Sequence, residues 1–199
     1  MHMQVYDPSY RSAQALDSSQ LLTNFSLAEH DILPAISKFA CPDAAAMTAK
    51  LDKLNVYSAG DFFKAHIDTP CSVNHIGSLV VCLPHAHSGG SLVVQHHGSK
   101  VKYDWSSEDP GCEVQWAFFY SDVQHQISEV KGGHRVTLTY NLFAQAQDAQ
   151  PLKSIEFTAS ALGKLSRTPS TAPPSCQMVA SSALPCSTCT LTLARASVT

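Results

Sequence analysis

The chain has 199 residues, 44% of them hydrophobic, and a formal net charge of −3 at pH 7, so it is long and apolar enough for one domain with a sizeable core. This weak negative charge gives no electrostatic basis for binding nucleic acid or an acidic membrane surface. No apolar run reaches the roughly eighteen residues of a membrane span, and the N-terminus lacks the pattern of a signal peptide, so we expect a cytoplasmic or nuclear protein.

Residues 1–50 are predicted to form an N-terminal helical support. Apolar residues recur at helical spacing from Leu21 to Ile36, with Ser26 as a candidate N-cap. Pro34 falls inside this pattern, and a proline in a helix interior breaks the hydrogen-bond ladder. The pattern therefore predicts one or two short helices interrupted at Pro34.

Residues 51–145 are predicted to form a β-rich core. Short β-branched and aromatic runs alternate there with Gly, Pro, Asp and Ser clusters; the runs are LNVYSA, SLVVCLP, SLVVQHH, EVQWAFFY, HQISEV and RVTLTYNLF. Strands of this length and spacing are typical of an antiparallel barrel or sandwich. Gly89 and Gly90 are interpreted as a turn that leads into SLVVQ, because no G-K-[ST] follows to make a phosphate loop.

The chain beyond the core changes in composition. Residues 146–165 are predicted to be a short helical or irregular extension. Residues 166–199 hold thirteen Ser or Thr, four Pro and no aromatic or acidic residue. We expect this tail to be disordered, and its abrupt change of character raises the hypothesis of a misread gene end. The seven cysteines are expected to be free thiols, because the C-x-x-C at Cys186 and Cys189 lacks the second half of a zinc site.

Three residues have the chemistry of a metal centre. His66 and Asp68 are two apart, so on an extended segment they point to the same face, and His125 follows 57 residues after Asp68. Two imidazoles and one carboxylate form the facial triad of non-haem Fe(II) oxygenases, which leaves open positions for a bidentate cosubstrate and O2. An isolated H-x-D is a weak signal, and its value here depends on the residues that accompany it.

Arg135 follows His125 by ten residues in an alternating strand. Arg135, Thr137 and Thr139 share one face of that strand. A guanidinium can bind a carboxylate through two hydrogen bonds, and a neighbouring hydroxyl can donate a third. An exposed strand cation or a structural ion pair is the alternative interpretation of Arg135.

Together these motifs resemble a known family. The segment from about residue 54 to residue 143 is similar to the 2-oxoglutarate/Fe(II) oxygenase domain of the prolyl 4-hydroxylase-like group, particularly its fungal members. The resemblance lies in LNVYSAGDFFKAHIDTP, GSLVVCLP, SGGSLVVQHHG, YDW, VQWAFFYSDVQHQISEV and GGHRVTLTYNL. It implies a mainly β fold, a double-stranded β-helix of the jelly-roll or cupin kind, with short N-terminal helices.

The resemblance also implies an activity and its residues. Matched by motif, His66, Asp68 and His125 fall on the iron ligands, and Arg135 falls on the basic residue that pairs with the distal carboxylate of 2-oxoglutarate. Thr137 falls on its hydroxyl companion, and Tyr57 lies where related hydroxylases place a tyrosine that hydrogen-bonds the cosubstrate. The implied reaction uses Fe(II), 2-oxoglutarate and O2 to hydroxylate a protein side chain or a small organic substrate, releasing succinate and CO2.

Several alternatives stay open from sequence. A catalytically silent β-helix that serves as a binding module is the competing function. Asp122 either orients His125 or caps a turn. Trp116 and Phe118 are predicted to be core. The remaining histidines are expected to be solvated surface residues; they are His75, His85, His87, His96, His97 and His134. The motifs identify neither the substrate nor the oligomeric state.

Overall fold

The computed structural model describes residues 7–42, 44–146, 183–185 and 191–193, and the fold is mainly β. Most strands belong to two antiparallel sheets. The larger sheet has the order β13-β10-β6-β12-β4-β2, with β7 pairing β12 off this path. Its strands are β2 (Gln14–Asp17), β4 (Ala44–Ser58), β6 (His75–Cys82), β7 (His87–Gly89), β10 (Glu113–Tyr120), β12 (Val130–Ala146) and β13 (Ala183–Pro185).

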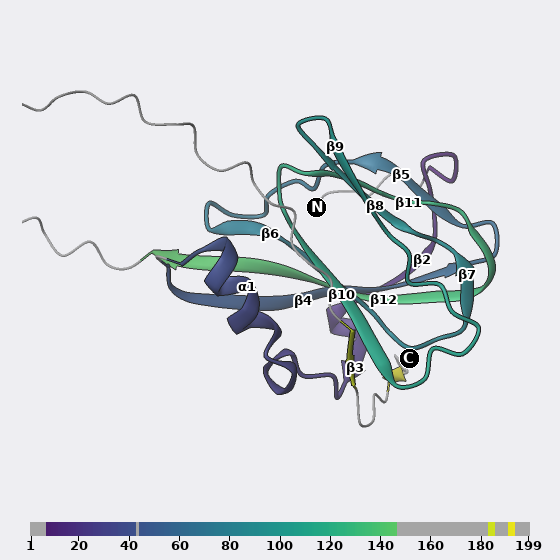
Figure 1. Cartoon of the computed structure of the whole chain (residues 1–199), viewed down its shortest axis with the longest axis horizontal. Coiled ribbons are helices and arrows are strands. Elements are labelled where there is room, and N and C mark those ends of the chain that lie inside the picture. The colour runs from purple at the N-terminus through teal and green to yellow at the C-terminus, as the bar shows by residue number, and fades with distance from the viewer. Residues whose placement is uncertain (1–6, 43, 147–182, 186–190, 194–199) are drawn as a thin grey trace, which may run out of the picture.

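The smaller sheet carries the strand order β1-β5-β11-β8-β9. Its members are β1 (Arg11–Ser12), β5 (Phe62–His66), β8 (Leu92–His96), β9 (Ser99–Tyr103) and β11 (Gln124–Ile127). A separate pair joins β3 (Leu21–Thr23) to β14 (Leu191–Leu193). The two main sheets face each other across the barrel, with β5, β8, β9 and β11 opposite β4, β10 and β12 (Figure 1). This is the double-stranded β-helix that the family resemblance implies.

Alternation along the long strands divides the larger sheet into two faces. Its inner face contributes to an apolar cluster between the sheets that includes Val80, Phe119 and Ile127. Its outer face packs under the N-terminal segment, where α1 (Ile32–Ala40) lies against β4 (Figure 1). Ile32 and Ile36 are four residues apart, so both point from α1 into the outer cluster, and both are fully buried. A helix therefore covers the outer face of the larger sheet, and the inner face packs toward the smaller sheet.

The N-terminal fifty residues contain short helices, as predicted, together with strands that were not predicted. Besides α1 there are two 3-10 helices, Ser18–Gln20 and Leu27–His30, but β1, β2 and β3 are strands, and β4 begins at Ala44. β1 and β2 cover free edges of the two main sheets, at β5 and β4, whereas β3 pairs with β14. Pro34 does not interrupt a helix: it lies in the first turn of α1, where the missing N–H is tolerated. The boundaries of a helical support stay a prediction.

The C-terminal predictions fall largely outside the described residues. Within the predicted disordered tail, β13 and β14 are the described parts, and both are strands rather than coil. The extension predicted for 146–165 lies outside the described residues except for its first residue, which ends β12. No helix of the described chain is both long and apolar enough to cross a membrane.

Candidate metal centre and anion pocket

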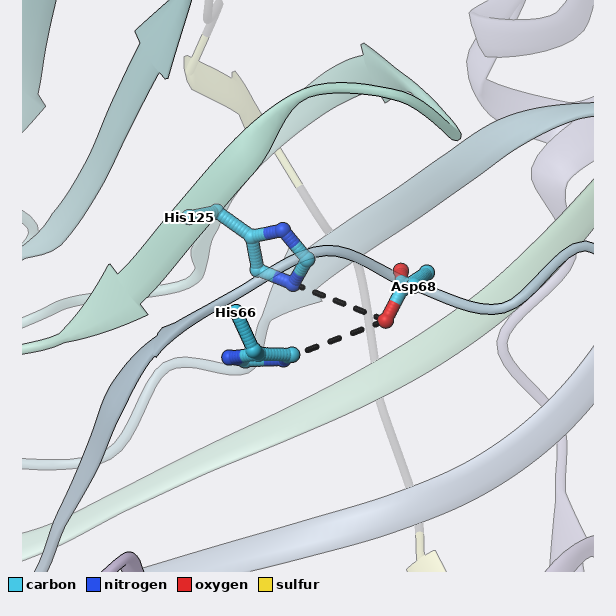
Figure 2. Close-up of side chains that lie close together, drawn as sticks. All are labelled: His66, Asp68 and His125. Atoms are coloured by element: carbon cyan, nitrogen blue, oxygen red, sulfur yellow. Dashed lines mark ion pairs between the residues drawn. The ribbon is translucent and has the colours of Figure 1, made fainter.

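The three predicted metal ligands lie together because two strands pair. His66 ends β5 and His125 lies in β11, and the two are direct partners in the antiparallel ladder. Asp68 follows β5 by two residues and turns back toward both rings. Its Oδ1 lies 3.8 Å from His66 Nε2 and 3.7 Å from His125 Nε2 (Figure 2). One ligand atom from each residue lies within 4.8 Å of the others, a spacing that suits a single metal ion.

Hydrogen bonds fix the orientation of all three side chains. His66 Nδ1 lies 2.8 Å from the Lys64 carbonyl oxygen, and His125 Nδ1 lies 3.2 Å from that of Val123. A ring that donates its Nδ1 proton to a carbonyl keeps the lone pair on Nε2, the atom that faces Asp68. Ser78 Oγ donates to Asp68 Oδ2 at 2.6 Å, which leaves Oδ1 directed at the two histidines.

Both imidazoles are held in the neutral form that a metal requires. Burial, with a smaller contribution from nearby His125, lowers the pKa of His66 from 6.5 to about 4. Burial also lowers the pKa of His125, although Asp68 opposes that shift. Neutral imidazoles with free Nε2 atoms beside a carboxylate are a donor set for a divalent transition metal.

Arg135 is a buried cation that lacks an anion. Its side chain is 1% exposed, and none of its three guanidinium nitrogens has a hydrogen-bond partner among the described residues. Its Cζ lies 5.7 Å from the ring centroid of Tyr57 and 5.5 Å from that of Trp105. Aromatic faces compensate only part of the desolvation of a charge, so this arrangement requires an anionic partner from outside the described chain.

One pocket of about 410 Å³ contains both the histidine–aspartate cluster and Arg135. All six predicted site residues line it: Tyr57, His66, Asp68, His125, Arg135 and Thr137. Thr137 is 1% exposed and Tyr57 is 3% exposed. Burial raises the pKa of the Tyr57 hydroxyl, so at neutral pH it is a phenol that can donate a hydrogen bond.

Gly90 makes room for the stem of Arg135. It has a φ of +67°, and a Cβ placed there would lie 2.9 Å from Arg135 Cδ and 2.8 Å from Val130 Cγ2. Gly89 also has a positive φ and ends β7, just before β8 begins. Both glycines therefore have the left-handed backbone conformation that favours glycine, and Gly90 also shapes the pocket wall.

The polar pocket residues that sequence reasoning missed include Arg11, Asn55 and Ser78. Asn55 carried a signal, since it lies two residues before Tyr57 on the same face of a strand. Ser78 lies two residues before Val80 on β6, so these two residues also share one face of a strand. Arg11 carried none, because it comes from a two-residue edge strand whose partner, β5, is about fifty residues away.

Other predictions had mixed outcomes. Trp116 and Phe118 are core, at 5% and 1% exposure. Asp122 does not orient His125: its Oδ2 lies 3.7 Å from His96 Nε2 instead. Two of the histidines expected at the surface, His75 and His87, are buried. Both nitrogens of His75 have backbone partners, the Cys71 N–H and the Gly77 carbonyl, which makes its burial tolerable.

The cysteines of the described chain agree with the expectation of free thiols. Cys41, Cys71, Cys82 and Cys112 form no disulfide. The C-x-x-C at 186 and 189, together with the cysteine at 176, lies outside the described residues. Across the described residues, the His66, Asp68 and His125 group is the one set of His, Cys, Asp or Glu side chains close enough to hold a metal.

One family model matches the part of the chain that contains this site. Residues 53–143 match the 2OG-Fe(II) oxygenase superfamily. This oxygenase-superfamily segment contains all six predicted site residues and extends from the second half of β4 to near the end of β12. No curated protein matches the chain significantly.

Solved structures similar to this chain include three oxygenases. An oxidoreductase of the 2OG-Fe(II) oxygenase family from Burkholderia pseudomallei is 18% identical, with 59% of this chain and 54% of that one covered and a TM-score of 0.46. A Pseudomonas putida prolyl-4-hydroxylase is 16% identical, with 70% and 75% covered and a TM-score of 0.43. A Trichoplax adhaerens prolyl hydroxylase, solved with a hypoxia inducible factor peptide fragment, is 17% identical, with 70% and 66% covered and a TM-score of 0.44. The chain thus spans about half the length of the Burkholderia protein.

Proposed function

We propose that the chain is an Fe(II)- and 2-oxoglutarate-dependent dioxygenase of the prolyl 4-hydroxylase-like group. It would hydroxylate a protein side chain or a small organic substrate and release succinate and CO2. The observation that carries this proposal is the unpartnered guanidinium of Arg135 in the same pocket as a two-histidine, one-aspartate cluster. A metal site alone fits many proteins, and a buried arginine alone fits many anions. Their combination fits a carboxylate-bearing ligand that also reaches the metal.

The pocket residues fit both Fe(II) and 2-oxoglutarate. His66, Asp68 and His125 would hold Fe(II) through two neutral nitrogens and one carboxylate oxygen, the donor set of non-haem iron oxygenases. When bound, the iron supplies O2 activation coupled to decarboxylation of 2-oxoglutarate, which drives oxidation of a substrate C–H bond. The orphaned nitrogens of Arg135 fit the distal carboxylate of that cosubstrate.

The chain's own residues would orient the cosubstrate and exclude water from it. Arg135 can bind its distal carboxylate with two parallel hydrogen bonds, and Thr137, on the same face of β12, can add a third. Tyr57 stays protonated and can donate its hydroxyl hydrogen to a cosubstrate oxygen. Apolar side chains line the pocket beside these polar groups and would exclude water from a bound cosubstrate; they are Phe63, Val80, Leu92, Phe119 and Ile127.

An anaerobic titration tests this function. The purified full chain is given Fe(II) and then 2-oxoglutarate while the metal-to-ligand charge-transfer absorption is followed. We expect a band that needs both components and disappears in Asp68→Ala. The matched control is Asp122→Ala, which removes an exposed aspartate outside the pocket and should keep the band.

A folded protein that gives no band would contradict the proposal. The catalytically silent binding module would then be the better description of the barrel. Circular dichroism and size-exclusion chromatography of the same samples show whether each variant is folded. Succinate formed under air then measures turnover directly.

A further inference from the structure

A second guanidinium enters the pocket from a distant segment. Arg11 lies in β1, where it is the ladder partner of Phe63 on β5. Backbone and side-chain hydrogen bonds hold this strand: the Lys64 N–H donates to the Tyr10 carbonyl at 3.0 Å, and Ser12 Oγ donates to Asp61 Oδ1 at 2.5 Å. The pairing of β1 with β5 therefore fixes the backbone of Arg11 beside the pocket.

The side chain of Arg11 is oriented toward the pocket by its neighbours. Its Nη2 donates to Asn55 Oδ1 at 2.6 Å, and its Cζ lies 5.0 Å from the ring centroid of Phe63. The Phe63 ring in turn stacks on His66, with 3.6 Å between ring centroids. Arg11 is thus connected through one aromatic ring to a candidate metal ligand, and both line the same pocket.

Arg11 has unused hydrogen-bonding capacity. Its Nε is buried and has no hydrogen-bond partner among the described residues. Within that part of the chain it also forms no ion pair with a carboxylate; the nearby Asp61 is occupied by Ser12 and by the Ser58 N–H. A buried N–H of a charged group without a partner is costly, and it marks a place where a ligand oxygen belongs.

The charge of the loaded pocket points to the kind of ligand. A divalent metal, Arg11 and Arg135 bring four positive charges, whereas Asp68 and the 2-oxoglutarate dianion bring three negative charges. Asp52 also lines the pocket, but Lys53 neutralises it at 3.0 Å. The two carboxylates of the cosubstrate are already matched by Arg135 and by the metal. One positive charge, that of Arg11, remains without a counter-charge.

We propose that Arg11 binds a carboxylate of the primary substrate, so that the enzyme acts on an acid rather than on a neutral molecule. This inference rests on the proposed function, because it assumes that metal and 2-oxoglutarate occupy the other two anion-binding positions. A free carboxylic acid and an acidic residue of a peptide offer the same group. Planar, two-point recognition by a guanidinium suits either of them.

Matched acid and amide probes test the proposal by binding. The full chain is loaded with Mn(II), which supports no turnover, and saturated with 2-oxoglutarate. Calorimetric titrations then compare free L-amino acids with their carboxamides, and capped tripeptides with a central Asp with those bearing Asn. We expect at least one acid to bind about ten- to a hundredfold more tightly than its amide, the range of a charge-assisted hydrogen bond.

Two variants assign this preference to Arg11. Arg11→Gln should remove the acid-over-amide preference, and Arg11→Lys should retain part of it, because the charge remains while the fork geometry is lost. Lys102→Gln removes one positive charge outside the pocket and should preserve the preference. Preference among the amino acids would identify a free acid as the substrate class, and preference among the tripeptides would identify a peptide.

Three results would overturn the proposal. One is a panel in which no acid binds more tightly than its amide, and another is a preference that survives in Arg11→Gln. The third is a larger loss of 2-oxoglutarate affinity in Arg11→Gln than in Arg135→Gln, which would make Arg11 a cosubstrate ligand. Failure of 2-oxoglutarate to bind the Mn(II)-loaded wild-type chain is a separate result, which would reject the proposed function and this inference together.

Discussion

The two faces of β12 each carry fully buried residues, but these residues are apolar on the outer face and polar on the inner face. Leu138 and Leu142, on the outer face, are fully buried in the apolar cluster that includes Ile36 of α1. Arg135 and Thr137, on the inner face, are each 1% exposed and line the pocket. Outer-face burial removes apolar area from water and stabilises the fold. Inner-face burial desolvates polar groups, so it favours the fold only when a ligand completes it. Equal burial therefore does not mean equal contribution to stability.

Replacing the inner cation should separate stability from binding most clearly. Arg135→Met keeps a flexible, unbranched stem but removes the guanidinium and its charge. We expect 2-oxoglutarate affinity to fall by about a hundredfold, the loss of a two-point charged contact. The ligand-free protein should become more stable, on the order of 1 kcal/mol, because a buried unpartnered charge is gone. Charge-transfer titration and urea denaturation measure the two effects.

A surface lysine provides the matched control for this substitution. Lys131→Met removes a charge that is paired with Glu129 and largely exposed, so both quantities should stay within about 0.5 kcal/mol of wild type. If Arg135→Met bound 2-oxoglutarate as the wild type does, the carboxylate would have to be held by another residue. If the variant were strongly destabilised, the inner face would contribute to the fold in the same way as the outer face.

Truncation on the outer face should have the opposite signature. Leu138→Ala removes a fully buried side chain from the apolar cluster and should reduce the free energy of unfolding by about 2–5 kcal/mol. The residues that line the pocket keep their positions in the strand register, so 2-oxoglutarate affinity of the folded fraction should change little. Urea denaturation gives the first quantity and equilibrium dialysis the second. A large loss of affinity per folded molecule would show that the two faces are coupled.

A smaller effect is expected from the serine behind the metal ligand. Ser78→Ala removes the hydrogen bond to Asp68 Oδ2 and should weaken Mn(II) or Co(II) binding about tenfold, because partners of ligands orient them. Ser78→Thr, which keeps the hydroxyl, should restore most of the affinity. Ser91→Ala, a buried serine that does not line the pocket, is the matched control. Unchanged metal affinity in Ser78→Ala would show that Asp68 needs no such support.

The smallest expected effect concerns acid stability of the metal-free protein. The pKa of His66 is lowered from 6.5 to about 4, and that of His125 is lowered as well. Between pH 6.5 and about 4 these histidines bind protons in the unfolded chain but not in the folded chain. The free energy of unfolding therefore falls as the pH decreases from about 6.5, and it levels off near pH 4. Urea denaturation at several pH values measures this slope. His66→Gln should flatten it, and an unchanged slope would mean that other groups cause it.

Sequence patterns predicted the barrel because its strands alternate. The run EVQWAFFY is β10 from first to last residue, and RVTLTYNLF lies within β12 with Arg135, Thr137 and Thr139 on the pocket side. Tyr57, which the family resemblance selected, lines the same pocket from β4. Period-two patterning reports which side chains share a surface, so it predicts a site wherever the site lies on long strands.

Sequence analysis missed features whose position depends on contacts between distant segments and not on the local residue pattern. β1 has two residues, too few for any periodicity, and its position depends on an edge of β5 that the local sequence does not reveal. Arg11 therefore looked like one polar residue among many. Backbone groups bind both ring nitrogens of buried His75 and the Nδ1 of buried His87, and such partners depend on the folded loop. Asp122 pairs with His96 for the same reason, since the adjacent β8 and β11 bring them together.

The ladder partnership of His66 with His125 has a consequence for how the metal and the fold depend on each other. In the unfolded chain these side chains are separated by a long loop, and they meet only when β5 docks on β11. A metal that bridges them would act as a reversible cross-link, closing that loop as a disulfide closes one. The melting temperature should then rise with free metal concentration, by mass action alone. With iron as the proposed metal, its free concentration would set the stability of the fold as well as the loading of the site.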